Sequence, residues 1–159
     1  MPRIVIETKI YAPIEICFDL SRSIDLHVVS TSQTNEIAIE GKTSGLINLN
    51  ESVTWQATHF GIRQKLSSII TEFQSPIYFK DEQLKGVFKY FKHEHFFSQH
   101  QNYTLMKDVF EYVSPLGIFG KIANFFLLNN HLKQLLIKRN QVIKEHAENG
   151  KFKEILKNA

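Results

Sequence analysis

The sequence predicts an α+β fold, in which a curved antiparallel sheet of seven strands wraps around one long C-terminal helix. Three observations predict it. The chain starts with a strand-like alternation, continues through six segments rich in β-branched and aromatic residues, and ends in a long stretch with apolar residues at helical spacing. Its 159 residues are the size of one ordinary domain, so we expect residues 1–159 to form a single domain.

The first strand and two short helices open the chain. Residues 3–11 alternate apolar and polar side chains, which is the period of a strand. Pro13 ends the strand and suits a first helical turn, where Glu15 interacts favourably with the positive end of the helix dipole. A second short helix is expected at about 24–31. Two short helices therefore follow strand one.

Turn residues divide the middle of the chain into short segments. Glycines, Ser75-Pro76 and the polar stretch 99–102 separate runs rich in Val, Ile, Thr, Phe, Tyr and Trp. The short connections indicate an antiparallel meander. The six expected strands cover about 34–40, 51–60, 62–74, 77–85, 87–98 and 103–113.

A long helix is expected from about 117 to 148. It follows the turn at Ser114-Pro115, carries an apolar stripe at helical spacing, and ends at Asn149-Gly150. The short basic tail, residues 150–159, has room for one or two further helical turns. One long helix cannot fill a strongly curved sheet completely, so we expect a cavity between them.

Composition restricts the function classes. No apolar run is long enough to span a bilayer, and the strand-like start does not fit a signal peptide. The only cysteine, Cys17, excludes an internal disulfide and a cysteine-built zinc site, and it fits a cytoplasmic protein. The net charge is +3, and residues 116–159 hold eight Lys/Arg against three Glu. We interpret that excess as a solvated helix face, with no nucleic-acid partner and no stable membrane insertion.

The segment FKYFKHEHFF, residues 88–97, places two histidines on an apolar strand face. Phe91, His93, His95 and Phe97 share one parity, while Lys92 and Glu94 lie on the other and can be solvated. A hairpin tip near His100 and Gln101 sets the pairing with the next strand. That register predicts three opposed pairs on the inner face: His93 with Asp108, His95 with Met106, and Phe91 with Phe110.

A second hairpin is expected to turn at Phe60-Gly61. Val53, Trp55, Ala57 and His59 then share one face, and Val53 and Trp55 identify that face as the inner one. His59 therefore joins His93, His95 and Asp108 as a candidate on the concave side of the sheet. His27 lies on the short helices beside it.

Three chemical roles suit this group. Histidines at i and i+2 with a third from another strand can bind a metal, but the strands need not bring them together, and we predict no metal ligands and no cofactor. A His93–Asp108 pair can instead act as acid and base in a cyclisation or dehydration. The third interpretation, which we favour, is that the two residues satisfy each other and give a bound ligand one polar anchor.

Four stretches carry a resemblance to a known superfamily. IYAPIEICFDL (10–20), WQATHFG (55–61), FKYFKHEHFF (88–97) and TLMKDVFEYVSPLGIFGKIA (104–123) resemble the START-like, or helix-grip, superfamily, also called SRPBCC. They are most similar to a bacterial branch grouped with polyketide cyclases and lipid-transport proteins. The likeness extends to about residue 147. It implies a deep hydrophobic pocket between sheet and long helix that holds a lipid, a sterol-like or an aromatic ligand. The superfamily's oxygenases need iron ligands on the helices, and the sequence has no matching histidine pair there.

Three hypotheses follow for the function. The preferred one is binding of a small hydrophobic or aromatic molecule. The second is a cyclase-type enzyme with His93 and Asp108 as catalytic residues, and the third is delivery of lipid to a partner through the basic C-terminus. The oligomeric state stays open and includes a homodimer. The residues expected to contact ligand are His27, Trp55, His59, Phe91, His93, His95, Phe97, Met106, Asp108, Phe110 and Phe125. His100, His131 and His146 are expected to be exposed.

Overall fold

The computed structural model describes residues 1–114 and 121–157, with the backbone alone for 121–125. Its strands and helices occur in the expected order. The strands are β1 (Arg3–Ile10), β2 (Ile37–Gly41), β3 (Ser52–His59), β4 (Ile62–Gln74), β5 (Tyr78–Lys85), β6 (Tyr90–Gln99) and β7 (Thr104–Val113). The helices are α1 (Ile14–Ser21), α2 (Ile24–Ser30), the 3-10 turn η1 (Ser32–Thr34), α3 (Lys121–Glu148) and α4 (Phe152–Leu156).

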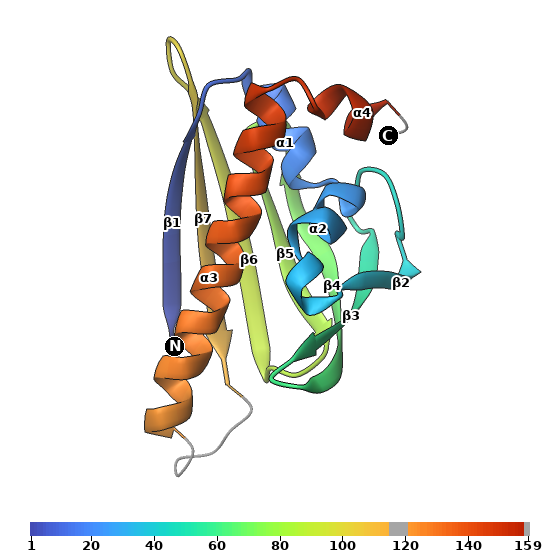
Figure 1. Ribbon diagram of the computed structural model, residues 1–159, viewed down its shortest axis with the longest axis vertical. Coiled ribbons are helices and arrows are strands. Elements are labelled where there is room, and N and C mark those ends of the chain that lie inside the picture. The colour runs from blue at the N-terminus through green and yellow to red at the C-terminus, as the bar shows by residue number, and fades with distance from the viewer. Residues whose placement is uncertain (115–120, 158–159) are drawn as a thin grey trace.

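The seven strands form one antiparallel sheet in the order β1-β7-β6-β5-β4-β3-β2. β1 closes one edge by pairing with β7, so the chain's first and last strands are neighbours. Figure 1 shows α3 running along one side of this sheet, with α1 and α2 packed beside it. This arrangement confirms the predicted α+β fold of a curved sheet around a long C-terminal helix.

The element boundaries differ little from those predicted. The strands begin and end within three residues of the expected positions, and the two short helices follow Pro13 and Ser23. Ser23 caps α2 by accepting a hydrogen bond from the Leu26 amide at 3.2 Å. The predicted start of the long helix, at residue 117, lies outside the described residues.

One of the two hairpins has the predicted register and the other does not. The β3–β4 turn lies at Phe60-Gly61 as predicted, with both residues at positive φ. The predicted β6–β7 register is wrong by two residues. His93 lies opposite Phe110, and His95 lies opposite Asp108. The tip falls after Gln101 because Gln99 pairs with Thr104, and a shift of two leaves every side chain on its predicted face.

The apolar core has two parts along α3. The larger part gathers α1, the middle of the sheet and the C-terminal half of α3, where Val142, Ile143 and Ala147 are buried. The smaller part holds Phe91, Phe110 and Tyr112, with Leu128, Leu132 and Leu136 of α3 only partly buried against them. These three leucines are therefore packed less tightly than Val142, Ile143 and Ala147.

Candidate functional site: a cavity with a histidine–aspartate wall

A cavity of about 670 Å³ lies between the sheet and α3. Side chains of β3–β6 form one wall, and α2 and α3 form the other. Most of the lining is apolar and includes Val53, Trp55, Ile70, Phe79, Leu132 and Leu136. The partly buried leucines of α3 thus lie over a hollow between helix and sheet, as the sequence led us to expect.

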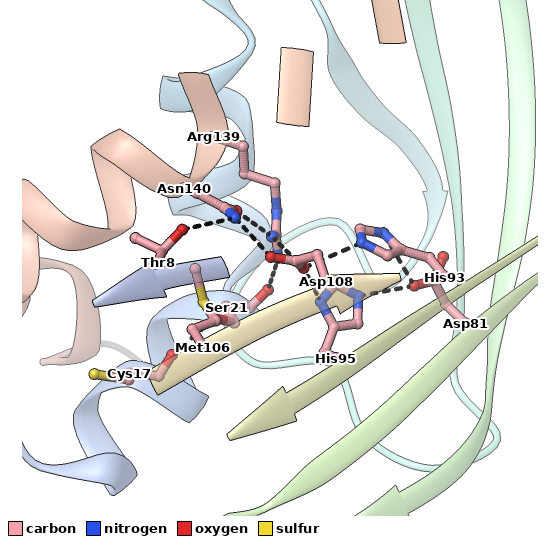
Figure 2. A network of polar contacts seen from close by, with 10 residues as sticks. All are labelled: Thr8, Cys17, Ser21, Asp81, His93, His95, Met106, Asp108, Arg139 and Asn140. Carbon is pink, nitrogen blue, oxygen red and sulfur yellow. Dashed lines mark hydrogen bonds and ion pairs between the residues drawn. The ribbon is translucent and has the colours of Figure 1, made fainter. Parts of the chain in front are cut away.

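One wall of the cavity is polar. Asp81 of β5 and His93 and His95 of β6 line it, and Asp108 of β7 lies directly behind them (Figure 2). Nε2 of His93 is 3.1 Å from Oδ1 of Asp108, and Nδ1 of His95 is 2.8 Å from the same oxygen. Nε2 of His95 is 3.2 Å from Oδ1 of Asp81. Two imidazoles therefore lie between two carboxylates.

Helix α3 completes this cluster with two consecutive residues. Asn140 donates a hydrogen bond of 2.6 Å to Oδ2 of Asp108. Nη1 of Arg139 lies 3.5 Å from Oδ1 of Asp108, while its Nη2 donates a 2.7 Å hydrogen bond to the carbonyl of Ser21. Both residues are buried. The helix therefore supplies the only permanent cation among the contacts of Asp108 in the described chain.

The electrostatics favour ionised carboxylates and a neutral His93. Burial raises the pKa of Asp108, but the hydrogen bond from His93, the close approach of His95 and the charge of Arg139 outweigh it and hold this pKa well below its usual value. The pKa of Asp81 is also lowered, because the contacts with His95 and His93 overcome burial. Burial, followed by the nearby His95, lowers the pKa of His93 to about 4. His93 is then a neutral imidazole at physiological pH.

A second polar group lies on β3 and the helices. Nδ1 of His59 is 3.0 Å from Nε2 of His131 on α3. His27 of α2 lies against Trp55, with ring centroids 4.2 Å apart, and its Nε2 is 3.5 Å from Oε2 of Glu36. All five residues line the cavity. His131 was expected to be exposed; it is half-buried because α3 turns it toward β3.

The eleven residues predicted to contact ligand occupy different places. Seven line the cavity: His27, Trp55, His59, Phe91, His93, His95 and Phe110. Asp108, Phe97 and Met106 lie in the buried layer behind it. The side chain of Phe125 lies outside the described residues. Contact with a ligand remains a prediction for all of them.

Three residues of the cluster were not predicted from the sequence. Asp81 lies two positions after the buried Phe79 on β5, so the parity of that strand places it on the inner face. Arg139 and Asn140 interrupt the apolar stripe of α3 between Leu136 and Val142. A polar pair within an apolar stripe was the available signal.

Cys17 is unsuited to act as a nucleophile. It is completely buried in α1, and burial raises the pKa of its thiol to about 11. Because the thiolate is the reactive form, the thiol is inert near neutral pH. Cys17 is therefore a core residue, in line with its apolar helical context.

Among the described residues, no helix combines the length and apolar character needed to cross a membrane. The C-terminal lysines Lys151, Lys153 and Lys157 are exposed, while Phe152 and Ile155 of α4 pack against the core. The basic tail therefore presents a solvated face, and its apolar side belongs to the domain.

Comparison with known proteins shows the fold alone. No protein-family model and no curated protein matches the chain. The protein TTHA0849 from Thermus thermophilus superimposes with a TM-score of 0.70 at 14% identity, covering 89% of this chain and 97% of that one. Ara h 8.0201 gives a TM-score of 0.68 at 9% identity, over 92% and 97% of the two chains. Major latex-like protein 151 from Panax ginseng gives 0.64 at 15% identity, also over 92% and 97%. The chain therefore has a Bet v1-like helix-grip α+β fold.

Proposed function

We propose that the protein binds a small hydrophobic molecule, lipid-like or aromatic, in the cavity between the sheet and α3. The observation that carries this proposal is the cavity itself, about 670 Å³ in volume with a mainly apolar lining and one polar wall. Ligand sites of roughly 300–1,000 Å³ with a few placed polar groups are typical of proteins that bind small molecules.

The side chains that line the cavity indicate which parts of a ligand would be apolar and which polar. An apolar body would lie against Phe79, Trp55 and Leu132, where removal of its surface from water contributes about 25 cal/mol per Å². A single polar group would face Asp81, His93 and His95. The free, buried Cys17 fits the further expectation that binding takes place in the cytoplasm.

Cavity filling provides the sharpest test. Ala57 is buried on the cavity side of β3, whereas its neighbour Thr58 is exposed on the opposite face. Ala57→Phe should reduce binding of a fluorescent hydrophobic probe at least tenfold, because the new ring occupies the hollow. Thr58→Phe adds the same ring outside the cavity and should leave binding within about twofold.

Native mass spectrometry of freshly purified protein gives an independent measurement. We expect an apolar adduct that is lost under denaturing conditions and is absent from Ala57→Phe. The proposal fails if wild type carries no adduct and binds no hydrophobic probe. It also fails if Ala57→Phe unfolds more easily by about 1–3 kcal/mol, the cost of overpacking, since that would mean the space is already filled.

The second candidate is an enzyme of the cyclase or dehydratase kind, related to the polyketide cyclase branch. Its specific support is the 3.1 Å contact between Nε2 of His93 and Oδ1 of Asp108 beside the cavity. A neutral imidazole oriented by a carboxylate is suited to accept a proton from a bound substrate. His93→Gln should then abolish turnover of a polyketide-like test substrate while probe binding persists. Equal turnover in wild type and variant rules out this role.

The third candidate, lipid delivery through the basic C-terminus, has weaker support. Lys151, Lys153 and Lys157 are exposed and can attract anionic lipid surfaces. Wild type should then bind anionic liposomes in a salt-sensitive way, and a triple Lys→Gln variant should not. Salt-insensitive binding, or none, removes this candidate and leaves ligand binding unaffected.

A further inference from the structure

Both imidazoles of the histidine–aspartate wall lie close to both carboxylates. His93 and His95 make four close approaches to Asp81 and Asp108, at 3.1, 2.8, 3.2 and 4.0 Å. A neutral imidazole has one N–H group and one lone pair, so only one nitrogen of such a ring can donate to a carboxylate. The other nitrogen is free to bind a cation.

One nitrogen of each ring lies near a carboxylate oxygen without a hydrogen bond to it. Nε2 of His93 hydrogen-bonds to Asp108, so its Nδ1 carries the lone pair and faces Oδ1 of Asp81 at 4.0 Å. Nδ1 of His95 is buried and has no hydrogen bond, although Oδ1 of Asp108 is 2.8 Å away. Figure 2 shows both rings between the two carboxylates, with Asp108 on the helix side. Each ring thus presents one nitrogen to Asp108 and the other to Asp81.

We propose that Asp81, His93 and His95 bind a divalent transition-metal ion such as Zn²⁺ at the cavity wall, with Asp108 orienting both imidazoles from behind. One carboxylate oxygen and two imidazole nitrogens are a donor set that such ions favour. Metal-bound histidines usually donate their second N–H to a carboxylate. Asp108 contacts Nε2 of His93 at 3.1 Å and lies 2.8 Å from Nδ1 of His95. This inference does not depend on the proposed hydrophobic ligand.

The distances suit a metal with small adjustments. The three ligating atoms lie within 4.8 Å of one another, and Oδ1 of Asp81 is 3.2 Å from Nε2 of His95 and 4.0 Å from Nδ1 of His93. Tetrahedral zinc with bonds of about 2.0–2.2 Å separates its ligand atoms by roughly 3.3–3.6 Å. The metal form requires the proton of His95 to sit on Nδ1, facing Asp108. Oδ1 of Asp108 is 2.8 Å from this nitrogen, so a small rotation of the ring would complete a hydrogen bond there.

The charges of the cluster favour an added cation. Two ionised carboxylates face one guanidinium, and Arg139 already contacts Asp108 and the carbonyl of Ser21. The carboxylate of Asp81 has no permanent cation within 4.0 Å in the described chain. A divalent ion at Asp81 supplies one. Three protein ligands leave at least one coordination position, and because all three line the cavity, this position is open to an oxygen or nitrogen atom of a bound molecule.

A second proton on His95 is the alternative to a metal ion as the cation between the two carboxylates. An imidazolium at His95 would donate to both Asp81 and Asp108 and would occupy the position of the metal. Nitrogen-15 NMR at pH 7.5 separates the two states, because an imidazolium has both ring nitrogens protonated. The metal site predicts one protonated nitrogen in each ring once Zn²⁺ has been added.

The experiment uses protein stripped with a chelator and titrated with Zn²⁺ or Co²⁺ alone. We expect one equivalent to bind, with the visible absorption of low-coordinate Co²⁺. Asp81→Asn and His93→Gln should each weaken binding at least tenfold, and Asp108→Asn by about 10–100-fold through loss of orientation. The control is His100→Ala, an exposed histidine at the β6–β7 tip, which should bind like wild type.

Several outcomes would overturn the site. They are no stoichiometric binding to wild type, affinity unchanged in Asp81→Asn, or a doubly protonated His95 that persists with Zn²⁺ present. X-ray absorption of the Co²⁺-loaded wild type, which must show two imidazole ligands, decides the matter if a variant does not fold. Probe binding by the metal-free protein is measured in parallel, so loss of the metal site and loss of the hydrophobic ligand are distinguishable.

Discussion

The side-chain amide of Asn140 donates a 2.6 Å hydrogen bond to Oδ2 of Asp108, joining α3 to β7 inside the core. The same amide lies 3.2 Å from the hydroxyl of Thr8 on β1. Asn140 is 2% exposed and Asp108 is fully buried. One side chain therefore links the helix to two neighbouring strands.

Removal of this amide should destabilise the fold. Asn140→Ala leaves Oδ2 of a buried carboxylate without its donor, and we expect the free energy of unfolding to fall by about 1–3 kcal/mol. Urea unfolding followed by circular dichroism measures the loss. Gln141→Ala, at the exposed neighbouring position, should change stability by less than about 0.5 kcal/mol. Equal effects of the two variants would contradict the assigned role.

Replacement of Arg139 should destabilise the fold more than the loss of one exposed charge would. Arg139→Met removes the cation beside Asp108 and the donor to the Ser21 carbonyl, which ties α3 to α1. Breaking a buried pair typically costs about 3–5 kcal/mol, because the partner remains charged. Lys138→Met, at an exposed position of the same helix, is the matched control for urea unfolding. If Arg139→Met loses no more free energy of unfolding than Lys138→Met, the contacts of Arg139 do not hold α3 to α1.

Acid should weaken the contact between β3 and α3. Burial lowers the pKa of both His59 and His131, and their 3.0 Å contact needs one neutral ring as acceptor. With a folded pKa below the unfolded value, the unfolded chain binds more protons just below pH 6.5, so stability falls as the pH drops through that range. Unfolding at pH 7.5 and pH 5 measures this slope.

The matched variant carries His59→Gln and His131→Gln together. It keeps polar side chains at both positions but has no ring to protonate there, so its stability should fall less than that of wild type between pH 7.5 and pH 5. An identical pH dependence in the two proteins would exclude the pair as its source.

Gly41 and Gly61 both have positive φ, but only at Gly41 would an added Cβ also collide with a neighbour. Alanine at the two positions therefore distinguishes the cost of a collision from the cost of backbone strain. A Cβ at Gly41 would collide with the backbone carbonyl of Ser52 across the β2–β3 pair, whereas at Gly61 it would meet open space. Gly61→Ala should cost about 1 kcal/mol for its left-handed conformation. Gly41→Ala should cost clearly more, as measured by urea midpoints. Similar urea midpoints for the two variants would show that β2 shifts enough to accommodate the added Cβ.

The sequence predicted the fold because its signals were local. Alternation on β3 and β6, the Phe60-Gly61 turn and the apolar stripe of α3 each depend on residues close together in the chain. The inner face of β6 was predicted correctly, and Asp108 was placed near His93 despite a register error of two residues. That error was harmless because side chains on a strand repeat every second residue.

The rest of the site depends on contacts between distant segments. Asp81 stands in the charged run KDEQ, where a buried carboxylate resembles its solvated neighbours. Arg139 and Asn140 reach Asp108 only because α3 crosses the sheet at that height, and helical spacing alone does not fix where it crosses. Likewise, His131 meets His59 only through the docking of α3 on β3.

The two tightly held residues near the middle of α3 also divide the helix into two parts that are packed differently. Arg139 and Asn140 are bonded to α1, β1 and β7, and the helix beyond them is buried in the larger core. Before them, Leu128 and Leu132 cover the cavity while remaining partly accessible. We therefore expect a ligand to reach the cavity by displacing the part of α3 before residues 139–140, while the part after them stays packed on the sheet.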